Sequence, residues 1–497
     1  MMRLGTFPDN ETEPGVYRVT LFPCDGVLLM SAHAVTSRAA EVIEADVAVI
    51  GGGPSGAATA TYLARAGYRV VLFEREQFPR FRIGESLLPL NLPILKELGL
   101  EAEMEKRFIR KYAANFSDRW GARQSRYPFA RAINRNHPYA YQVERAEFDE
   151  MLLDNAAKSG TRVYMPWAVR EVLFDGERAT GVVAEAMDGS GSLTVHCPMV
   201  VDASGRSAFL GARLGFKRDI NLNSRTAFYS HFEGVTHDPG ERSGDIQVVS
   251  FPHGWFWMIP FKNGNTSVGM VVTEEYLRRR GKIAAEAMAA GRLPVVEHDG
   301  SNEAVAGKAD AANDAFLWHT IENIPYVAER MKGAQQKFPA RSIANFSYRM
   351  ERYAGPGYVM LGDAGAFLDP VFSSGVFLTM KSAQVASKAI VQSFQTGDFS
   401  GRHLRLYEKR IRGAQKIFFR FIRGWYDPAF LDLFFYSSNF MGLKTAITSV
   451  LAADLFDPHH LWNLKLRINL LFALANLHRL RVRLFRRGRS YVQQLPV

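Results

Sequence analysis

The 497-residue sequence predicts an α/β fold with a Rossmann-like domain, an antiparallel-sheet domain and a C-terminal helical lobe. Three observations support this. Apolar segments flank a glycine-rich turn within residues 46–74, strand-like alternation fills 211–339, and aromatic helical segments dominate 397–497. A chain of this length exceeds one ordinary hydrophobic core, so several domains are expected.

The glycine-rich turn follows the order strand, turn, helix, strand and acid. Residues 47–50 are apolar, as in a buried parallel strand, and a helix over 57–66 and a strand over 69–73 are expected next. The last strand ends on Glu74, whose carboxylate suits the ribose hydroxyls of an adenine dinucleotide. A turn without a ligand is the alternative interpretation. The glycine motif comprises Gly51, Gly53, Ser55 and Gly56.

Composition is that of an ordinary globular protein, with 47% hydrophobic and 22% charged residues. Two cysteines cannot form a disulfide framework, which predicts a reducing cytoplasm. The net charge of +11 favours acidic partners, but no nucleic-acid recognition module is present. Residues 1–43 lack periodicity and carry early acids unlike a signal peptide, so a flexible extension, or an upstream start with Met30 as the usual one, is expected.

Three further motifs are specific. Residues 74–89 read Glu-x-x-x-x-Pro-Arg-x-x-x-Gly-Glu-Ser-Leu-Leu-Pro, residues 254–260 read GWFWMIP, and residues 369–375 read DPVFSSG. Together they resemble the flavin-dependent halogenases over roughly residues 44–460. In that family the first motif is a strap that joins the flavin site to the substrate site. Taken alone, it is equally a polar connector in which Glu85 caps a helix continuing through Leu98.

The resemblance implies that the chain binds FAD through three separated segments. Arg145 resembles a position near the cofactor, although a surface salt bridge explains it nearly as well. Residues 200–206 resemble a second FAD-contacting segment, and Asp363 resembles an acceptor for the ribityl chain of the flavin. The remaining implied cofactor residues are Arg82, Gly84, Glu85, Ser86, Asp202, Gly205, Pro370, Gly375 and Val376.

The two tryptophans of the 254–260 motif are predicted to form one wall of a narrow passage. On a strand, Trp255 and Trp257 project from the same face, and the motif continues with Ile259 and Pro260. In the halogenases this wall separates substrate from flavin, which favours halide oxidation. Ordinary core packing is the alternative, since aromatic residues are common on strands.

Lys111 resembles the essential lysine of the family, which holds hypohalous acid by a hydrogen bond or becomes a haloamine beside the substrate. A solvated lysine in a basic segment is the alternative interpretation. The resemblance also implies a halide pocket at the backbone N–H groups of Ser374 and Gly375. Free-tryptophan halogenases place a glutamate where this chain has Phe372, which favours the branch acting on phenols, pyrroles or carrier-tethered substrates.

The predicted function is a two-component halogenase. A separate flavin reductase would supply FADH2, oxygen would give the C4a-hydroperoxide, and chloride or bromide would be oxidised to hypohalous acid that halogenates an electron-rich aromatic in secondary metabolism. The substrate is either a free molecule or tethered to a carrier protein. Alternatives are an FAD-dependent monooxygenase or reductase of the same fold, and a non-catalytic flavin-binding scaffold.

The C-terminal end of the sequence, residues 463–489, is rich in arginine and forms a basic tail. This tail has three interpretations: a solvated helix end, a docking surface for an acidic carrier protein, or a peripheral contact with anionic lipid. The expected organisation is an extension over 1–43, FAD segments over 44–89, 139–210 and 340–396, a strap-to-substrate region over 90–138, a substrate domain over 211–339 and a helical lobe over 397–497. Residues 291–314 are expected to form a mobile surface excursion.

Overall fold

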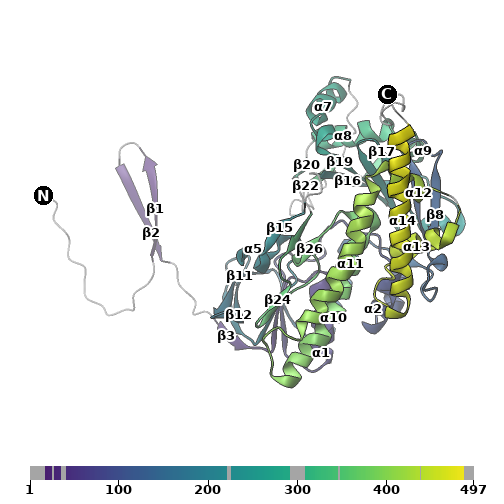
Figure 1. The fold of residues 1–497 in the computed structure, drawn as a ribbon. Coiled ribbons are helices and arrows are strands. Elements are labelled where there is room, and N and C mark those ends of the chain that lie inside the picture. The colour runs from purple at the N-terminus through teal and green to yellow at the C-terminus, as the bar shows by residue number, and fades with distance from the viewer. Residues whose placement is uncertain are drawn as a thin grey trace, which may run out of the picture.

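The computed structural model describes residues 17–24, 27–34, 41–220, 225–290, 308–309, 311–344, 347–436 and 438–485. Figure 1 shows a body of sheets flanked by helices, with an N-terminal hairpin standing apart from it. The predicted α/β class is confirmed.

A six-stranded sheet forms the nucleotide-binding half. Its strands are short, buried and apolar, and they pair in parallel except at the last edge, as expected for a sheet covered on both faces. Three distant parts of the chain supply the strands, as the sequence predicts. In spatial order they are β10 (Arg162–Tyr164), β5 (Val70–Phe73), β4 (Val47–Ile50), β14 (Met199–Asp202), β25 (Tyr358–Met360) and β24 (Ala354–Gly355).

The helices that cover this sheet begin at the carboxyl ends of strands. The helix α1 (Pro54–Arg65) follows β4 and starts before the expected residue 57, because Pro54 suits a first helical turn. It packs between α4 (Arg145–Lys158) and α10 (Ser374–Thr396).

The described part of the N-terminal region contains a hairpin, while the expectation of a flexible extension stays a prediction. The strands β1 (Tyr17–Cys24) and β2 (Val27–Ala34) pair as an antiparallel hairpin. The strand β3 (Glu41–Glu44) pairs in parallel with β13, so the body begins at residue 41 and not at 44. This sheet has the order β11 (Trp167–Asp175), β12 (Arg178–Ala186), β13 (Ser192–His196) and β3.

A nine-stranded sheet forms the other half. It contains the expected strands of the 211–339 segment and also β7 and β8, which precede that segment, so this half draws on two stretches of chain. Its order is β20 (Lys308–Ala309), β22 (Arg341–Ala344), β16 (Arg225–Glu233), β19 (Thr266–Thr273), β18 (Gly254–Pro260), β17 (Ile246–Phe251), β7 (Ala113–Asp118) and β8 (Gln124–Pro128), with β21 (Gln335–Gln336) beside β16. All neighbours are antiparallel except β7 and β17.

Smaller elements complete the body. The strands β6 (Ile109–Lys111) and β9 (Ala140–Gln142) pair with each other, as do β15 (Lys217–Asp219), β23 (Tyr348–Met350) and β26 (Ala366–Phe367). The short helices are α2 (Leu92–Glu97), α3 (Glu101–Arg107), α5 (Phe209–Arg213), α6 (Glu274–Leu277), α7 (Arg280–Ala289), α8 (Ala311–Glu322) and α9 (Pro325–Arg330). Most of the predicted excursion over 291–314 lies outside the described residues.

The C-terminal segment forms helices, as the sequence predicts, and their buried apolar residues belong to the same hydrophobic core as those of the sheets. The helices are α11 (Leu404–Trp425), α12 (Pro428–Phe434), α13 (Leu443–Leu451) and α14 (Pro458–Phe485), and α11 and α14 lie across the front in Figure 1. Phe434 on α12 packs edge-on against Phe116 of β7, with ring centroids 4.9 Å apart. Among the described residues, no helix combines the length and the apolar character that crossing a bilayer requires.

The strap is extended where a helix is expected. Gly84 has a φ of +99°, and the chain stays non-helical until the 3₁₀ turn at Pro89–Asn91 that precedes α2. Ser86 forms an isolated bridge with Gln142. The predicted helix after Gly84-Glu85-Ser86 is present and ends at Leu98, the C-cap of α2, as expected, but it starts later, at the turn of Pro89–Asn91. The left-handed Gly84 keeps the preceding strap out of a helical conformation.

Candidate functional site

A cavity of about 650 Å³ lies between the parallel sheet and the nine-stranded sheet. It is the larger of two cavities that matter here, and its walls come from the glycine turn, the strap, β14, β18 and the start of α10. The sequence-predicted residues that line it are Gly51, Gly53, Ser55, Glu74, Arg82, Gly84, Glu85, Ser86, Arg145, Gly205, Trp255, Trp257, Ile259, Asp363, Pro370, Gly375 and Val376.

The glycine turn requires residues without side chains. Gly51 has a φ of +101°, and a Cβ there would lie 2.6 Å from the carbonyl oxygen of Ala203. A Cβ on Gly56 would lie 1.9 Å from the carbonyl oxygen of Gly51, so Gly56 does not line the cavity but lets α1 approach the turn. The N-terminus of α1 thus borders the cavity with free backbone donors, an arrangement that binds pyrophosphate.

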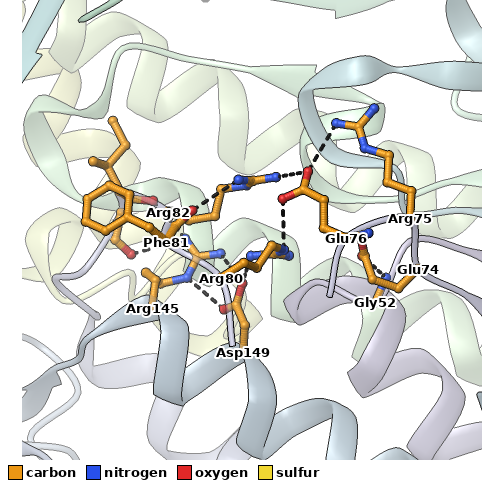
Figure 2. A network of polar contacts seen from close by, with 11 residues as sticks. Gly52, Glu74, Arg75, Glu76, Arg80, Phe81, Arg82, Arg145 and Asp149 are labelled. Atoms are coloured by element: carbon orange, nitrogen blue, oxygen red, sulfur yellow. Dashed lines mark hydrogen bonds and ion pairs between the residues drawn. The ribbon is translucent and has the colours of Figure 1, made fainter. Parts of the chain in front are cut away.

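Glu74 fixes the backbone beside this turn. Its Oε2 accepts the Gly52 N–H across 2.7 Å, and its Oε1 accepts the Glu76 N–H across 2.9 Å (Figure 2). The carboxylate is buried and lines the cavity, so it retains acceptor capacity toward a ribose as well as shaping the turn.

An arginine network holds the strap against α4. Asp149 is fully buried and pairs with Arg80 and Arg145, each across 2.8 Å, while Glu76 pairs with Arg82 (Figure 2). Arg145 Nη1 also donates to the Ile83 carbonyl. Arg145 is therefore not in a surface salt bridge: it joins the helix to the strap at the cavity wall.

Glu85 does not cap a helix, which corrects the alternative interpretation. Its Oε1 lies 2.7 Å from Nε2 of His231 on β16, and both side chains are largely buried. The strap is thus hydrogen-bonded to the nine-stranded sheet through Glu85 and to α4 through the Ile83 carbonyl group.

Asp202 is placed differently from its expected role. Its carboxylate is fully buried and accepts the backbone N–H groups of Ser204 and Leu210 across 3.0 and 2.8 Å. It does not line the cavity. Asp202 shapes the turn after β14, while Gly205 of that turn reaches the cavity wall.

The two tryptophans lie together, as the strand periodicity predicts. Their ring centroids are 5.7 Å apart, and both rings line the cavity. The Trp257 indole N–H donates to Ser267 Oγ, and the Trp255 indole N–H donates to Tyr426 at the end of α11, each across 3.0 Å. Pro260 ends β18 outside the cavity lining.

Lys111 lies in a second, much smaller cavity of about 10 Å³. Its Nζ donates to Ser86 Oγ across 2.8 Å and to the Leu87 carbonyl across 3.1 Å. Burial lowers the pKa of its amine from 10.5 to about 7, against the opposing effect of Asp245. Ile246, Val371 and Ser373 line both cavities, so the two spaces meet at the 369–375 turn.

The start of α10 lies where the two cavities meet, since Ser373, the residue just before this helix, lines both of them. Ser373 has a φ of +55° and precedes the helix, and a Cβ on Gly375 would meet no atom within 4 Å. Ser374 is buried outside the cavity lining. Burial raises the pKa of Asp363 to about 6, although the charges of Arg145 and Arg206 oppose this rise.

Phe372 occupies an aromatic environment. Its ring lies about 6 Å from the rings of Phe116, Trp425 and Phe421. Sequence reasoning missed the partners His231, Asp149 and Tyr426. Only Asp149 had a signal, since it stands four residues after Arg145 on one helix.

The residues present fit FAD. A glycine cradle that a Cβ would fill, a helix N-terminus, an acid after the second strand and a cavity of dinucleotide size occur in the required order. When bound, FAD would supply redox chemistry with oxygen, and this cavity would hold it.

Comparisons with known proteins agree. A family model described as an FAD binding domain matches residues 44–299. A 1H-pyrrole-2-carbonyl-[peptidyl-carrier protein] chlorinase of Pseudomonas fluorescens is 29% identical, over 84% of this chain and 95% of that protein. The flavin-dependent halogenase armH3 of Armillaria mellea is 31% identical, over 77% of this chain and 74% of its own length. The crystal structure of the myxobacterial chondrochloren halogenase CndH is 36% identical, with a TM-score of 0.66 over 78% of this chain and 83% of that one. With the FAD binding domain and these relatives in agreement, the chain belongs to the flavin-dependent halogenases.

Proposed function

We propose that the chain oxidises chloride or bromide with oxygen and FADH2 delivered by a separate reductase, and that it transfers the halogen to an electron-rich aromatic ring. The observation that supports this most directly is Lys111, a buried amine in a small cavity that meets the flavin cavity at Val371 and Ser373. An oxidant made in one cavity would reach the amine without crossing bulk water.

The amine has the properties this role needs. With a pKa of about 7, a substantial fraction of Lys111 is uncharged near neutrality and carries a lone pair. The bonds to Ser86 and Leu87 hold its Nζ in one position. Asp245 is not a free base beside it, since its oxygens accept from Ala113 and pair with Arg126.

The halide is proposed to bind at the backbone N–H groups of Ser374 and Gly375. They lie in the first turn of α10, where N–H groups have no partner within the helix and the helix dipole favours an anion. The open space at Gly375 gives such an anion room on the cavity side.

The substrate is proposed to be a pyrrole or phenol, free or carried by a carrier protein. The pyrrole-carrier chlorinase among the relatives supports this, as does the apolar environment of Phe372, which offers no carboxylate to deprotonate a less activated ring.

The outer face of α14 is the proposed docking surface for the carrier. Residues 458–485 contain no Asp or Glu, and the exposed side chains include Trp462, Leu466, Lys465, Arg481 and Arg483. Part of the basic tail is used internally, since Arg479 pairs with Asp427. An acidic protein surface complements such a face, and contact with anionic lipid is the alternative.

A reconstituted assay tests the function. Protein, FAD, a flavin reductase and NADH would be combined with a phenol, or with 1H-pyrrole-2-carbonyl on a peptidyl-carrier protein, with and without bromide. Halogenated product that disappears in Lys111→Ala and persists in Lys106→Ala, a lysine on the nearby α3, would support the proposal. Hydroxylated or halide-independent product would refute it.

Docking is tested separately. Binding of the carrier protein and of anionic vesicles would be compared for the wild type and a Lys465→Glu/Arg481→Glu variant. We expect carrier binding to weaken at least tenfold and vesicle binding to be negligible in both proteins. Vesicle binding lost in the variant would assign the face to lipid instead.

A further inference from the structure

Two consecutive residues of the strap, Glu85 and Ser86, have their hydrogen-bond partners on different sides of the strap. Ser86 accepts a hydrogen bond from Lys111 in the small cavity, whereas Glu85 pairs with His231 of β16 and lines the flavin cavity. The strap therefore presents an amine partner to one cavity and a carboxyl group to the other.

One oxygen of the Glu85 carboxyl group makes no hydrogen bond to the described residues. Oε1 contacts His231 Nε2, but Oε2 is buried and has no hydrogen-bond partner among the described residues. The side chain is only 1% exposed, so water does not satisfy this oxygen readily. Leaving a buried polar atom without a hydrogen bond is unfavourable, which favours a ligand in the flavin cavity as the partner of this oxygen.

His231, the partner of this carboxyl group, is itself buried among aromatic rings. The rings of Phe81, Phe261 and Phe338 lie 5.0–5.2 Å from its imidazole and hold it in place. Half-buried Glu144 is close enough for the charges of His231 and Glu85 to act on its pKa, which burial raises. The other charged groups that act on Glu85 or on its neighbour Tyr229 are Arg82, Arg145, Arg206 and Arg341.

The proposed reaction needs a proton in the flavin cavity. In balance, FADH2, oxygen, a halide ion and one proton give FAD, hypohalous acid and water. One proton is therefore consumed for every halide oxidised, inside a cavity whose function depends on keeping water out.

We propose that Glu85 passes this proton into the flavin cavity and that His231 is the positioning residue that supplies it. The ionised carboxylate takes a proton on Oε1 from His231 Nε2, which leaves a neutral carboxylic acid and a neutral imidazole. The acid then releases that proton into the flavin cavity and becomes a carboxylate again, so in balance the imidazolium has lost one proton and the cavity has gained it. The imidazole then regains a proton from the Glu144 side. The inference rests on the proposed halide oxidation.

A spectroscopic test does not depend on turnover. The visible absorption of bound, oxidised FAD would be titrated with pH in the wild type, in His231→Gln and in Glu85→Gln. Glu85 lines the cavity that would hold FAD, so a change of charge on the Glu85–His231 pair should perturb the flavin spectrum. We therefore expect a pH-dependent shift in the wild type that both variants lose. His237→Gln is the matched control, because His237 is also a partly buried histidine of this half, bonded to Thr266. FAD affinity should change less than about threefold, as expected if folding is intact.

The pH profile of hypohalous acid release supplies the second readout. We expect His231→Gln to slow release about 100-fold or more, the usual size of a general-acid contribution, and to change the shape of the dependence of release on pH. A uniform slowing with an unchanged profile, or an unchanged flavin titration, would overturn the proposal. If the wild type releases no hypohalous acid, the proposed function fails. The flavin spectrum as a function of pH then still shows whether Glu85 and His231 affect the bound cofactor.

Discussion

Trp255 donates its indole N–H to the Tyr426 phenol oxygen across 3.0 Å, and that hydroxyl donates to Asp369 Oδ2 across 2.7 Å. One tyrosine at the end of α11 thus joins the tryptophan wall to the turn that precedes α10. The guanidinium of Arg225 covers the Tyr426 ring at 3.4 Å. The C-terminal helices therefore hold the passage between the two cavities in shape.

Tyr426→Phe removes both hydrogen bonds and leaves Asp369 Oδ2 with only its longer ion pair to Arg225 Nε, at 3.9 Å. We expect the free energy of unfolding to fall by about 1–3 kcal/mol. We also expect less halogenated product for each hypohalous acid formed, because the wall can shift and oxidant escapes. Urea unfolding and a hypohalous acid trap measure the two effects. Tyr436→Phe, at an exposed tyrosine, is the control, and equal product ratios in both variants would contradict the prediction.

The pH dependence of halogen transfer reports on Lys111. Only the uncharged amine has a lone pair for a bond to halogen, and its pKa is about 7. We therefore expect product formation from added hypohalous acid to rise with pH through about 7 and then level off. A limb that falls over this range would show that the charged ammonium acts by hydrogen bonding instead.

Burial of Lys111 also makes stability depend on pH. The folded-state pKa of about 7 lies below the ordinary 10.5, so the unfolded chain binds more protons between these values. The free energy of unfolding should rise with pH across that window, and the full penalty applies below about pH 7. Lys111→Met should flatten this rise and be more stable by about 2 kcal/mol at pH 6, while losing halogenation. A less stable variant at pH 6 would show that the bonds to Ser86 and Leu87 outweigh burial of the charge.

Asp149→Ala tests the arginine network of the strap. It removes the paired carboxylate of Arg145 and leaves Arg80 with only its longer ion pair to Glu76, at 3.8 Å. Breaking a buried ion pair by removing one partner typically costs about 3–5 kcal/mol. We expect that loss of stability together with weaker FAD binding, since the strap is no longer held to α4. Asp154→Ala, at an exposed position of the same helix, should change neither quantity. Unchanged FAD affinity in Asp149→Ala would mean that the strap keeps its position without the network.

The parts of the fold that follow local rules were predictable. The glycine turn, the strand from Val47 to Ile50 and the pairing of the two tryptophans all depend on residues close in sequence. The partners of Glu85 and Trp255 were not, because His231 and Tyr426 stand 146 and 171 residues away and neither lies in a recognisable motif. The aromatic helices of residues 397–497 were expected from their sequence, but only the fold shows that their aromatic residues pack against those of β7.

The first turn of α10 offers a test that separates ligand binding from folding. Gly375→Ala adds a methyl group where nothing lies within 4 Å, so the free energy of unfolding should stay equal or rise by about 0.4–1 kcal/mol. The same methyl group enters the cavity where halide and flavin are proposed to meet. We therefore expect the apparent affinity for bromide to fall at least tenfold, measured from its effect on product formation and on the bound flavin spectrum. Gly413→Ala on α11 is matched to it, since a Cβ there also meets no atom within 4 Å but lies outside the cavity lining. Equal bromide affinity in both variants would remove the α10 N-terminus as the halide site.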